Sequence, residues 1–326
     1  MSQTRTPLDL SGIIEQSLAL IGGTFVRNVI IAALFLTLPL ILFTAAANEY
    51  FAGLLEMSDR LAGLGDGMER LTAMAGLFLP FIVSTLLLSL GSFITETACL
   101  QVAAGDLTGD PIGYATAITR TFDGRWLRGL GAEIIKVLAF TGTVIVAGLG
   151  AAVVSAAFGG VAGTLSTLLI ILLVGIGIPG VLYVVIRWNF SLAAAAIENR
   201  SPVDALQRSW SLMEGMWWRT FGILILLWIS VEFVTTIVSL PFTFGSMLDV
   251  YKEFFSVMRA NGGDVDQDLF ARLQAQMGSG MGVGIGVTTL LRVTLSPPVV
   301  AVVYQDLIVR SEPAAPLPLT PDGAEG

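Results

Sequence analysis

Two ionisable residues, Glu232 and Arg292, lie inside long apolar stretches, where a charged side chain costs at least about 2.5 kcal/mol at the centre of a membrane helix. Glu232 follows Arg219 by 13 residues, and Arg292 precedes Asp306 by 14 residues. At about 1.5 Å per helical residue, both reach a depth of roughly 20 Å on neighbouring antiparallel helices. We therefore predict an intramembrane ion pair. Two roles are open: fixing the register of the two helices, or forming a substrate or proton site near the midplane.

The composition restricts the chemistry that the other residues can perform. The 326 residues include no histidine and a single cysteine, Cys99. This removes histidine acid–base catalysis, serine–histidine triads, an internal disulfide and most zinc or iron sites. We predict no catalytic residue, no metal site and no cofactor. Residues 175–180 spell G-x-G-x-x-G, but inside an apolar stretch rather than between a strand and a helix, so they predict helix packing and not dinucleotide binding.

The hydrophobic content predicts a membrane protein. Hydrophobic residues make up 54% of the chain and charged residues 13%, against roughly 25% charged residues in soluble proteins. A net charge of -8 argues against nucleic acid as a partner. A bilayer core about 30 Å thick needs about 20 helical residues. Six apolar stretches reach that length, and they lie near residues 26–47, 74–97, 131–157, 165–188, 220–244 and 281–305. The sequence thus predicts an all-α, polytopic protein with six transmembrane helices.

A short motif, G-x-aromatic-x-R, occurs three times, each time directly before an apolar stretch. Successive copies are 101 and then 91 residues apart. We expect the glycine to end a preceding helix, the aromatic ring to lie at headgroup depth, and the arginine to keep its charge on the cytoplasmic side. We call it the interface motif. Its residues are Gly23, Phe25 and Arg27, then Gly124, Trp126 and Arg128, then Gly215, Trp217 and Arg219.

The recurrence of the motif predicts a membrane domain over residues 1–310 that consists of three repeats, at about 8–105, 106–199 and 200–310. Each repeat is expected to hold a short cytoplasmic amphipathic helix, the interface motif and a helical hairpin. Asp110-Pro111 and Ser201-Pro202 share the offset of 91 residues, and proline after an Asp or Ser cap marks a helix start. Chance similarity among apolar segments is the alternative. Residues 311–326 predict a disordered, acidic, proline-rich tail.

The distribution of cations orients the chain. With the amino terminus inside, eleven Lys and Arg residues fall on the cytoplasmic face and five on the opposite face. This bias predicts that both termini are cytoplasmic and that residues 48–73 and 248–279 are external. In the second external segment, Val250, Phe254 and Val257 follow i, i+4, i+7 spacing, which is typical of a helix on the membrane surface. We expect Gly262-Gly263 to break that helix.

The stretch from Ser201 to Thr220, SPVDALQRSWSLMEGMWWRT, resembles the bacterial membrane domain attached to some glycerophosphodiester phosphodiesterases, which also occurs as a stand-alone membrane protein. The family pattern is an sP-x-x-A-hydrophobic-x-x-S-W helix followed by G-x-aromatic-W-R and a span. Residues 8–14 fit the opening of the family, so the resemblance covers about 8–307. In the fused enzymes, hydrolysis belongs to a separate soluble barrel that uses histidines and a metal held by carboxylates. The resemblance therefore implies a membrane domain and carries no catalytic residue over to this chain.

These observations favour a non-enzymatic protein of the bacterial inner membrane. We expect an accessory or scaffold protein that engages membrane lipids, a partner membrane protein or a second copy of itself. The alternative is a small transporter or lipid-handling carrier with Glu232 and Arg292 at its centre. A polar, water-accessible cavity at Glu232 would favour the carrier, whereas a closed ion pair in a solid core would favour the scaffold.

Overall fold

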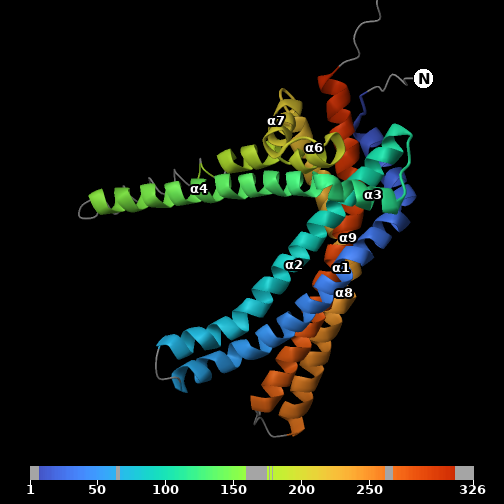
Figure 1. Cartoon of the computed structure of the whole chain (residues 1–326). Coiled ribbons are helices and arrows are strands. Elements are labelled where there is room, and N and C mark those ends of the chain that lie inside the picture. Colours follow the sequence, from blue (N-terminus) through green and yellow to red (C-terminus); the bar gives the residue numbers. More distant parts are fainter. Residues whose placement is uncertain are drawn as a thin grey trace, which may run out of the picture. The chain divides into compact units, whose positions relative to one another are not determined.

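The computed structural model describes residues 7–63, 67–158, 175, 177, 179–260 and 267–312, and the regular structure in these residues is helical (Figure 1). The helices are α1 (Leu10–Gly63), α2 (Gly67–Thr108), α3 (Tyr114–Arg120), the π-helical turn η1 (Thr121–Arg125), α4 (Trp126–Phe158), α6 (Ser191–Glu198), α7 (Pro202–Leu212), α8 (Trp217–Ala260) and α9 (Gln267–Ser311). Within the described residues, six helical stretches are long and apolar enough to cross a membrane. This confirms the predicted all-α, six-span class. The predicted break at Gly262-Gly263 and the predicted tail after residue 312 lie outside the described residues.

The chain divides into two compact units. The first unit comprises Met1–Leu20, Gly124–Ile223 and Val299–Gly326. The second unit comprises Ile21–Asp123 and Leu224–Pro298. Helices α1, α8 and α9 therefore contribute residues to both units.

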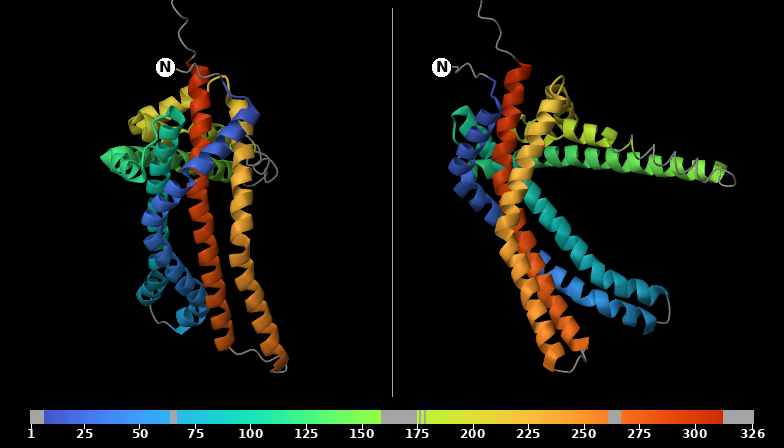
Figure 2. Two further views of the ribbon diagram at one scale, coloured as in Figure 1. Left: turned by 90° about the vertical axis from the view of Figure 1, so that its right-hand side faces the viewer. Right: turned by 180° about the vertical axis from the view of Figure 1, so that it is seen from behind.

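In the second unit, α1 lies beside α2, and α8 lies beside α9 (Figures 1 and 2). A hydrophobic cluster joins three of these helices, and it consists of Ala32, Leu36 and Phe43 from α1, Leu88 from α2 and Val293 from α9. The ring of Tyr50 on α1 stacks on that of Phe81 on α2 with centroids 4.5 Å apart. Apolar contacts of this kind hold the α1–α2 pair together and attach α9 to it.

Glycines on α9 allow close helix packing in the second unit. A Cβ atom on Gly282 would lie 2.9 Å from Cγ2 of Thr44, on α1. One on Gly284 would lie 2.2 Å from Oγ1 of Thr243, on α8. Both distances are too short for a real Cβ contact. Helix α9 thus presents glycine to α1 on one face and to α8 on another, which is the small-residue packing expected of membrane helices.

In the first unit, α4, α6 and α7 pack against one another. The alanines of α6 from Ala193 to Ala196 are fully buried. Gly131 of α4 lies so close to α7 that an added Cβ would be 2.7 Å from Cγ of Pro202. The side chain of Ser201 caps α7 by accepting a hydrogen bond from the Asp204 backbone N–H at 3.3 Å, and Pro202 is the first helical residue, as the sequence predicts.

The glycines of the interface motif do not all act as predicted. Gly215 has a left-handed φ of 74° and separates α7 from α8, and Gly124 has a φ of 90° within η1. Gly23, in contrast, lies inside α1, which continues through it without a break. The prediction that this glycine ends a separate amphipathic helix is therefore wrong. Nearby, the Asn28 side chain donates to the Thr294 carbonyl at 3.1 Å, a buried contact that involves the continuous helix.

Two other expected helix boundaries also differ. Helix α3 begins at Tyr114, three residues after Pro111, because Ile112 is buried and its carbonyl accepts a hydrogen bond from Arg27. The stripe of Val250, Phe254 and Val257, which the sequence predicts to be external, does form a cluster, with Val250 buried. It belongs to the continuous helix α8, however, and not to a separate surface helix.

Candidate functional site

The structure brings Glu232 of α8 and Arg292 of α9 together in the second unit. Arg292 Nε lies 3.4 Å from Glu232 Oε1. The pair is not enclosed by the protein as expected, because 54% of the Arg292 side chain and 28% of the Glu232 side chain are exposed. The adjacent residues Val293 and Thr294 are buried, so only one side of the pair is covered by helix packing. Such a pair can link two helices, and it can also meet a polar group from the surroundings.

In the first copy of the interface motif, Arg27 binds Asp106 near the end of α2. Arg27 Nη1 donates to Oδ1 at 2.9 Å, and Nη2 donates to Oδ2. Nη1 also donates to the Ile112 carbonyl at 3.0 Å, and Nη2 donates to the Gly23 carbonyl at 3.1 Å. The arginine and aspartate side chains are only 23% and 18% exposed. A forked, charged hydrogen bond is among the stronger side-chain contacts in proteins, so it fastens α1 to α2.

In the third copy, Arg219 binds Asp306 near the end of α9. Arg219 Nη1 donates to Asp306 Oδ2 at 2.9 Å, and Nη2 donates to the Leu8 carbonyl at 2.9 Å. Asp306 also accepts from Arg310 Nε at 3.0 Å and from the Leu8 backbone N–H at 2.8 Å. The Asp306 side chain is fully buried. One carboxylate therefore connects the start of α8, the end of α9 and the segment before α1.

In the second copy, the partner of the arginine is neutral. Arg128 Nη1 donates to the Asn199 backbone carbonyl at 2.7 Å and also to its side-chain oxygen. Asn199 follows α6 with a left-handed φ of 57°. The contact is exposed and has no carboxylate, so it contributes less than the two charged contacts.

The acid at the end of α6, Glu198, binds other residues of the first unit. It accepts from the Tyr304 hydroxyl at 2.5 Å, from Arg200 Nε at 2.6 Å and from Arg208 Nε at 3.2 Å. Arg208 Nη1 also lies 2.7 Å from Glu312. Burial disfavours the charge of Arg208, but the carboxylates of Glu312 and Glu198 outweigh it and raise the pKa of its guanidinium. The charged guanidinium therefore joins α7 to the end of α6 and to the residue after α9.

Each motif arginine also donates to a backbone carbonyl in a segment that leads into a helix. Arg27 holds the segment before α3, Arg128 the segment before α7, and Arg219 the segment before α1. In sequence order, each copy thus contacts the chain near the start of the next predicted repeat, and the third copy contacts it near the start of the first. Sequence reasoning missed these partners and assigned the arginines to the membrane surface only. A signal was present, since Asp106 and Asp306 both follow an apolar stretch and both precede a leucine.

The aromatic residues of the interface motif have three different surroundings. Phe25 lies within α1 and is 40% exposed. Trp126 is the first residue of α4 and is half-buried. Trp217 is the first residue of α8 and stacks on Phe221 with ring centroids 5.1 Å apart. That the three aromatic residues share one depth at the membrane surface stays a prediction.

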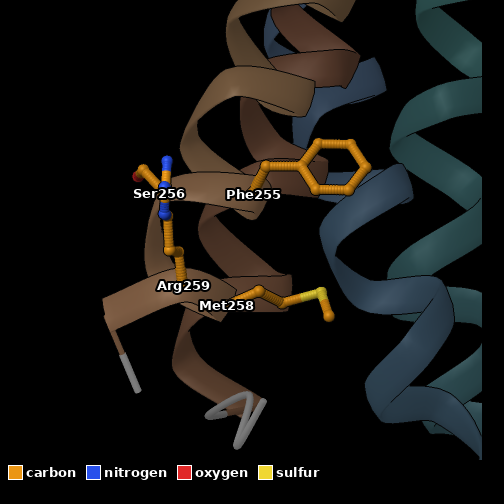
Figure 3. Close-up of a pocket in the computed structure, with 4 residues that line it drawn as sticks. All are labelled: Phe255, Ser256, Met258 and Arg259. Atoms are coloured by element: carbon orange, nitrogen blue, oxygen red, sulfur yellow. The ribbon is translucent and has the colours of Figure 1, made fainter. Parts of the chain in front are cut away.

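A hollow lies near the carboxyl end of α8, where Phe255 and Met258 point to one side of the helix and Ser256 and Arg259 to the other (Figure 3). Among the described residues, its lining contains one cation, Arg259, and no acid, so these residues offer no acid–base pair. Across the part of the chain that the structure describes, no three His, Cys, Asp or Glu side chains are grouped to hold a metal ion.

Comparison with known proteins bears on the family. No curated protein and no solved structure matches the chain. A family model matches 98 residues, which contain the SPVDALQRSWSLMEGMWWRT stretch and Glu232. Together with the six apolar helices, this match identifies an integral, multi-pass membrane protein. The predicted resemblance is confirmed over residues 163–260, which match the family described as the membrane domain of glycerophosphoryl diester phosphodiesterase.

Proposed function

We propose that the protein is a non-enzymatic accessory or scaffold protein of the bacterial cytoplasmic membrane. In this role it engages membrane lipids, a partner membrane protein or a second copy of itself. The observation that supports this role most is that several arginines pair with acids on neighbouring helices. Arg27 and Arg219 each bind an acid near the end of the next long helix, and Arg292 binds an acid on the helix before its own. Charges bound in this way fix the positions of helices. The absence of histidine from all 326 residues also argues against acid–base catalysis.

A carrier role is the second candidate, and the exposure of the Glu232–Arg292 pair favours it. More than half of the Arg292 side chain is uncovered by protein. Ionisable groups within a span face the bundle interior or a water-filled cavity in most membrane proteins, where they mark transport pathways. A solute or a proton that reached the pair would exchange with one of its partners. The two candidates differ in what the pair does, which substitution can measure.

Under the scaffold role, we expect Glu232→Gln and Arg292→Gln each to lower the melting temperature in detergent, and the double substitution to recover most of the loss. The reason is that each single change leaves one charge without its partner, whereas the double change leaves none. The exposed pair Lys252–Asp249, with 75% and 60% exposed side chains, supplies the control. Lys252→Gln and Asp249→Asn should leave the melting temperature unchanged, because exposed pairs contribute little.

The carrier role predicts a different pattern in the same variants. Proton flux and movement of a fluorescent phospholipid, each measured in vesicles that contain the protein, should then exceed those in empty vesicles. The flux should vanish in both single variants and stay absent in the double variant, while the melting temperature changes little. That combination of flux and stability results would support the carrier role and contradict the scaffold role. Equal flux in vesicles with and without the wild-type protein, together with the recovered stability, supports the scaffold.

The proposed orientation, with both termini in the cytoplasm, is tested by cysteine labelling of intact cells. The native Cys99 is fully buried, so it gives a low background. A membrane-impermeant maleimide should label Met68→Cys and Lys252→Cys from outside, because both positions are exposed and lie in the predicted external segments 48–73 and 248–279. It should label Ser311→Cys only after the membrane is permeabilised. The reverse pattern would contradict the orientation that the eleven-to-five cation bias predicts.

A further inference from the structure

Arg187 occupies an unusual position in the first unit. It is the last helical residue before the turn that leads into α6, and only 9% of it is exposed. Its guanidinium carbon lies 4.4 Å from the centroid of the Trp210 ring and 5.1 Å from that of Tyr183. Aromatic rings attract a cation through their faces. The aromatic rings do not accept the hydrogen bonds that the guanidinium N–H groups donate in the plane of the guanidinium.

Those in-plane donors have no acceptor. Among the described residues, no carboxylate or carbonyl accepts a hydrogen bond from the Arg187 guanidinium, and its Nε is fully enclosed without a partner. The motif arginines Arg27, Arg128 and Arg219, in contrast, each donate to an acceptor. Of the three Arg187 nitrogens, only Nε is enclosed in this way, so the terminal pair keeps the residual exposure. A buried cation without a counter-charge is costly, and an anion that reached the terminal nitrogens would remove that cost.

A second unpartnered donor lies in the same cluster. The indole Nε1 of Trp217 is also enclosed, and no described residue accepts a hydrogen bond from it. The Trp217 ring lies 5.3 Å from the Tyr183 ring, and Tyr183 in turn lies under the Arg187 guanidinium. Both side chains contact one tyrosine. Buried polar groups normally have partners, and of these two side chains Arg187 is the one whose remaining donors, the terminal nitrogens, are open to a ligand.

The backbone around Arg187 is held in place without that ligand. The hydroxyl of Ser209, which is fully buried, donates to the Arg187 carbonyl at 2.6 Å and accepts from the Phe190 backbone N–H at 3.1 Å. Ser209 precedes Trp210 on α7, so the same turn of helix fixes both the backbone of the arginine and the ring against which it packs. The cluster is therefore pre-organised, which lowers the cost of binding.

We propose that Arg187, held between Trp210 and Tyr183, binds a phosphate anion through its terminal nitrogens. Arginine suits this ligand, since its planar fork donates two parallel hydrogen bonds to phosphate oxygens. Tryptophan and tyrosine are enriched at headgroup depth in membrane proteins, where phosphate is abundant. The inference rests on the proposed function, in that it names the chemistry by which an accessory protein would engage lipid. The phosphate can come from a lipid headgroup or from a soluble molecule.

The test titrates purified protein in detergent with three probes and follows tryptophan fluorescence. The probes are dioctanoyl phosphatidylglycerol, inorganic phosphate, and dioctanoylglycerol, which lacks the phosphate. We expect saturable binding of at least one of the two phosphate probes and none of dioctanoylglycerol. Arg187→Gln should weaken that binding at least about tenfold, the effect of losing charged hydrogen bonds. Arg120→Gln, the matched loss of an exposed cation, should leave it unchanged. The probe that binds identifies the source of the phosphate.

Arg187→Lys keeps the cation and removes the planar fork of donors, so it tests the site even where Arg187→Gln fails to fold. We expect this variant to keep its melting temperature and to bind the same probe several-fold more weakly. The proposal is overturned where neither phosphate probe binds the wild type, or where binding survives these substitutions unchanged. Neither result bears on the scaffold role, which is tested separately by the stability and flux of the Glu232 and Arg292 variants.

Discussion

Replacing Asp306 by alanine is expected to lower the free energy of unfolding by about 3 kcal/mol, one of the two largest effects that we predict for this protein. The carboxylate is fully buried and accepts hydrogen bonds from Arg219, Arg310 and the Leu8 backbone. Alanine leaves two guanidinium groups and one partly buried backbone N–H without this acceptor. Chemical denaturation in detergent measures the loss. Faster proteolysis near Leu8 should accompany it, because Asp306 also holds the segment before α1.

The matched controls separate charge from shape. Asp306→Asn keeps the size and one oxygen acceptor but removes the charge, so its effect should lie between those of the wild type and Asp306→Ala. Asp110→Ala removes an exposed aspartate of the second unit and should have no measurable effect. An Asp306→Ala protein as stable as the Asp110→Ala protein would show that the Asp306 contacts contribute nothing to stability.

The sequence was sufficient to predict the six spans, because a bilayer sets one length for every helix that crosses it. It was also sufficient to bring Glu232 and Arg292 together, since helix rise converts a residue count into a depth. Both arguments need only distance along a straight helix. They do not say which side chains cover the pair, and the 54% exposure of Arg292 was not foreseen.

The interface motif shows where local pattern stops being informative. Gly215 ends the turn after α7 with a left-handed backbone, whereas Gly23 lies in an unbroken helix. Glycine permits both conformations, so contacts elsewhere in the chain decide between them. Near Gly23, those contacts include the bond from Asn28 to a carbonyl 266 residues away. A pattern of five residues does not contain that information.

The sequence does not reveal the partners of Arg187 and of the motif arginines for the same reason, because those partners are distant in the chain. Trp210 is 23 residues from Arg187, and Asp106 is 79 residues from Arg27. Without the packing of the helices, an arginine at the end of a span has one generic interpretation, a snorkelling cation at the headgroups. The structure distinguishes arginines bound to acids from the one that packs between aromatic rings with unused donors.

The second large effect is expected at Arg27, and it is measured by making the same change at all three motif arginines. Arg27→Gln should lower the free energy of unfolding by about 2 to 3 kcal/mol, because Asp106 loses its forked partner and no other cation replaces it among the described residues. Arg219→Gln should cost less, since Arg310 still binds Asp306. Arg128→Gln should cost less than about 1 kcal/mol, because its partner Asn199 is neutral and the contact is exposed.

The order of the three effects decides between two accounts of the motif. Where the arginines act as surface cations that meet lipid headgroups, three residues in equivalent positions should lose equal stability. Where they act through the contacts in the structure, the losses should fall in the order Arg27, Arg219, Arg128. Adding Asp106→Asn to Arg27→Gln should then recover most of the loss, because the second change removes the acid that the first left unpaired. Equal losses of stability in the three variants, without recovery in the double variant, would indicate that the motif arginines act only at the membrane surface.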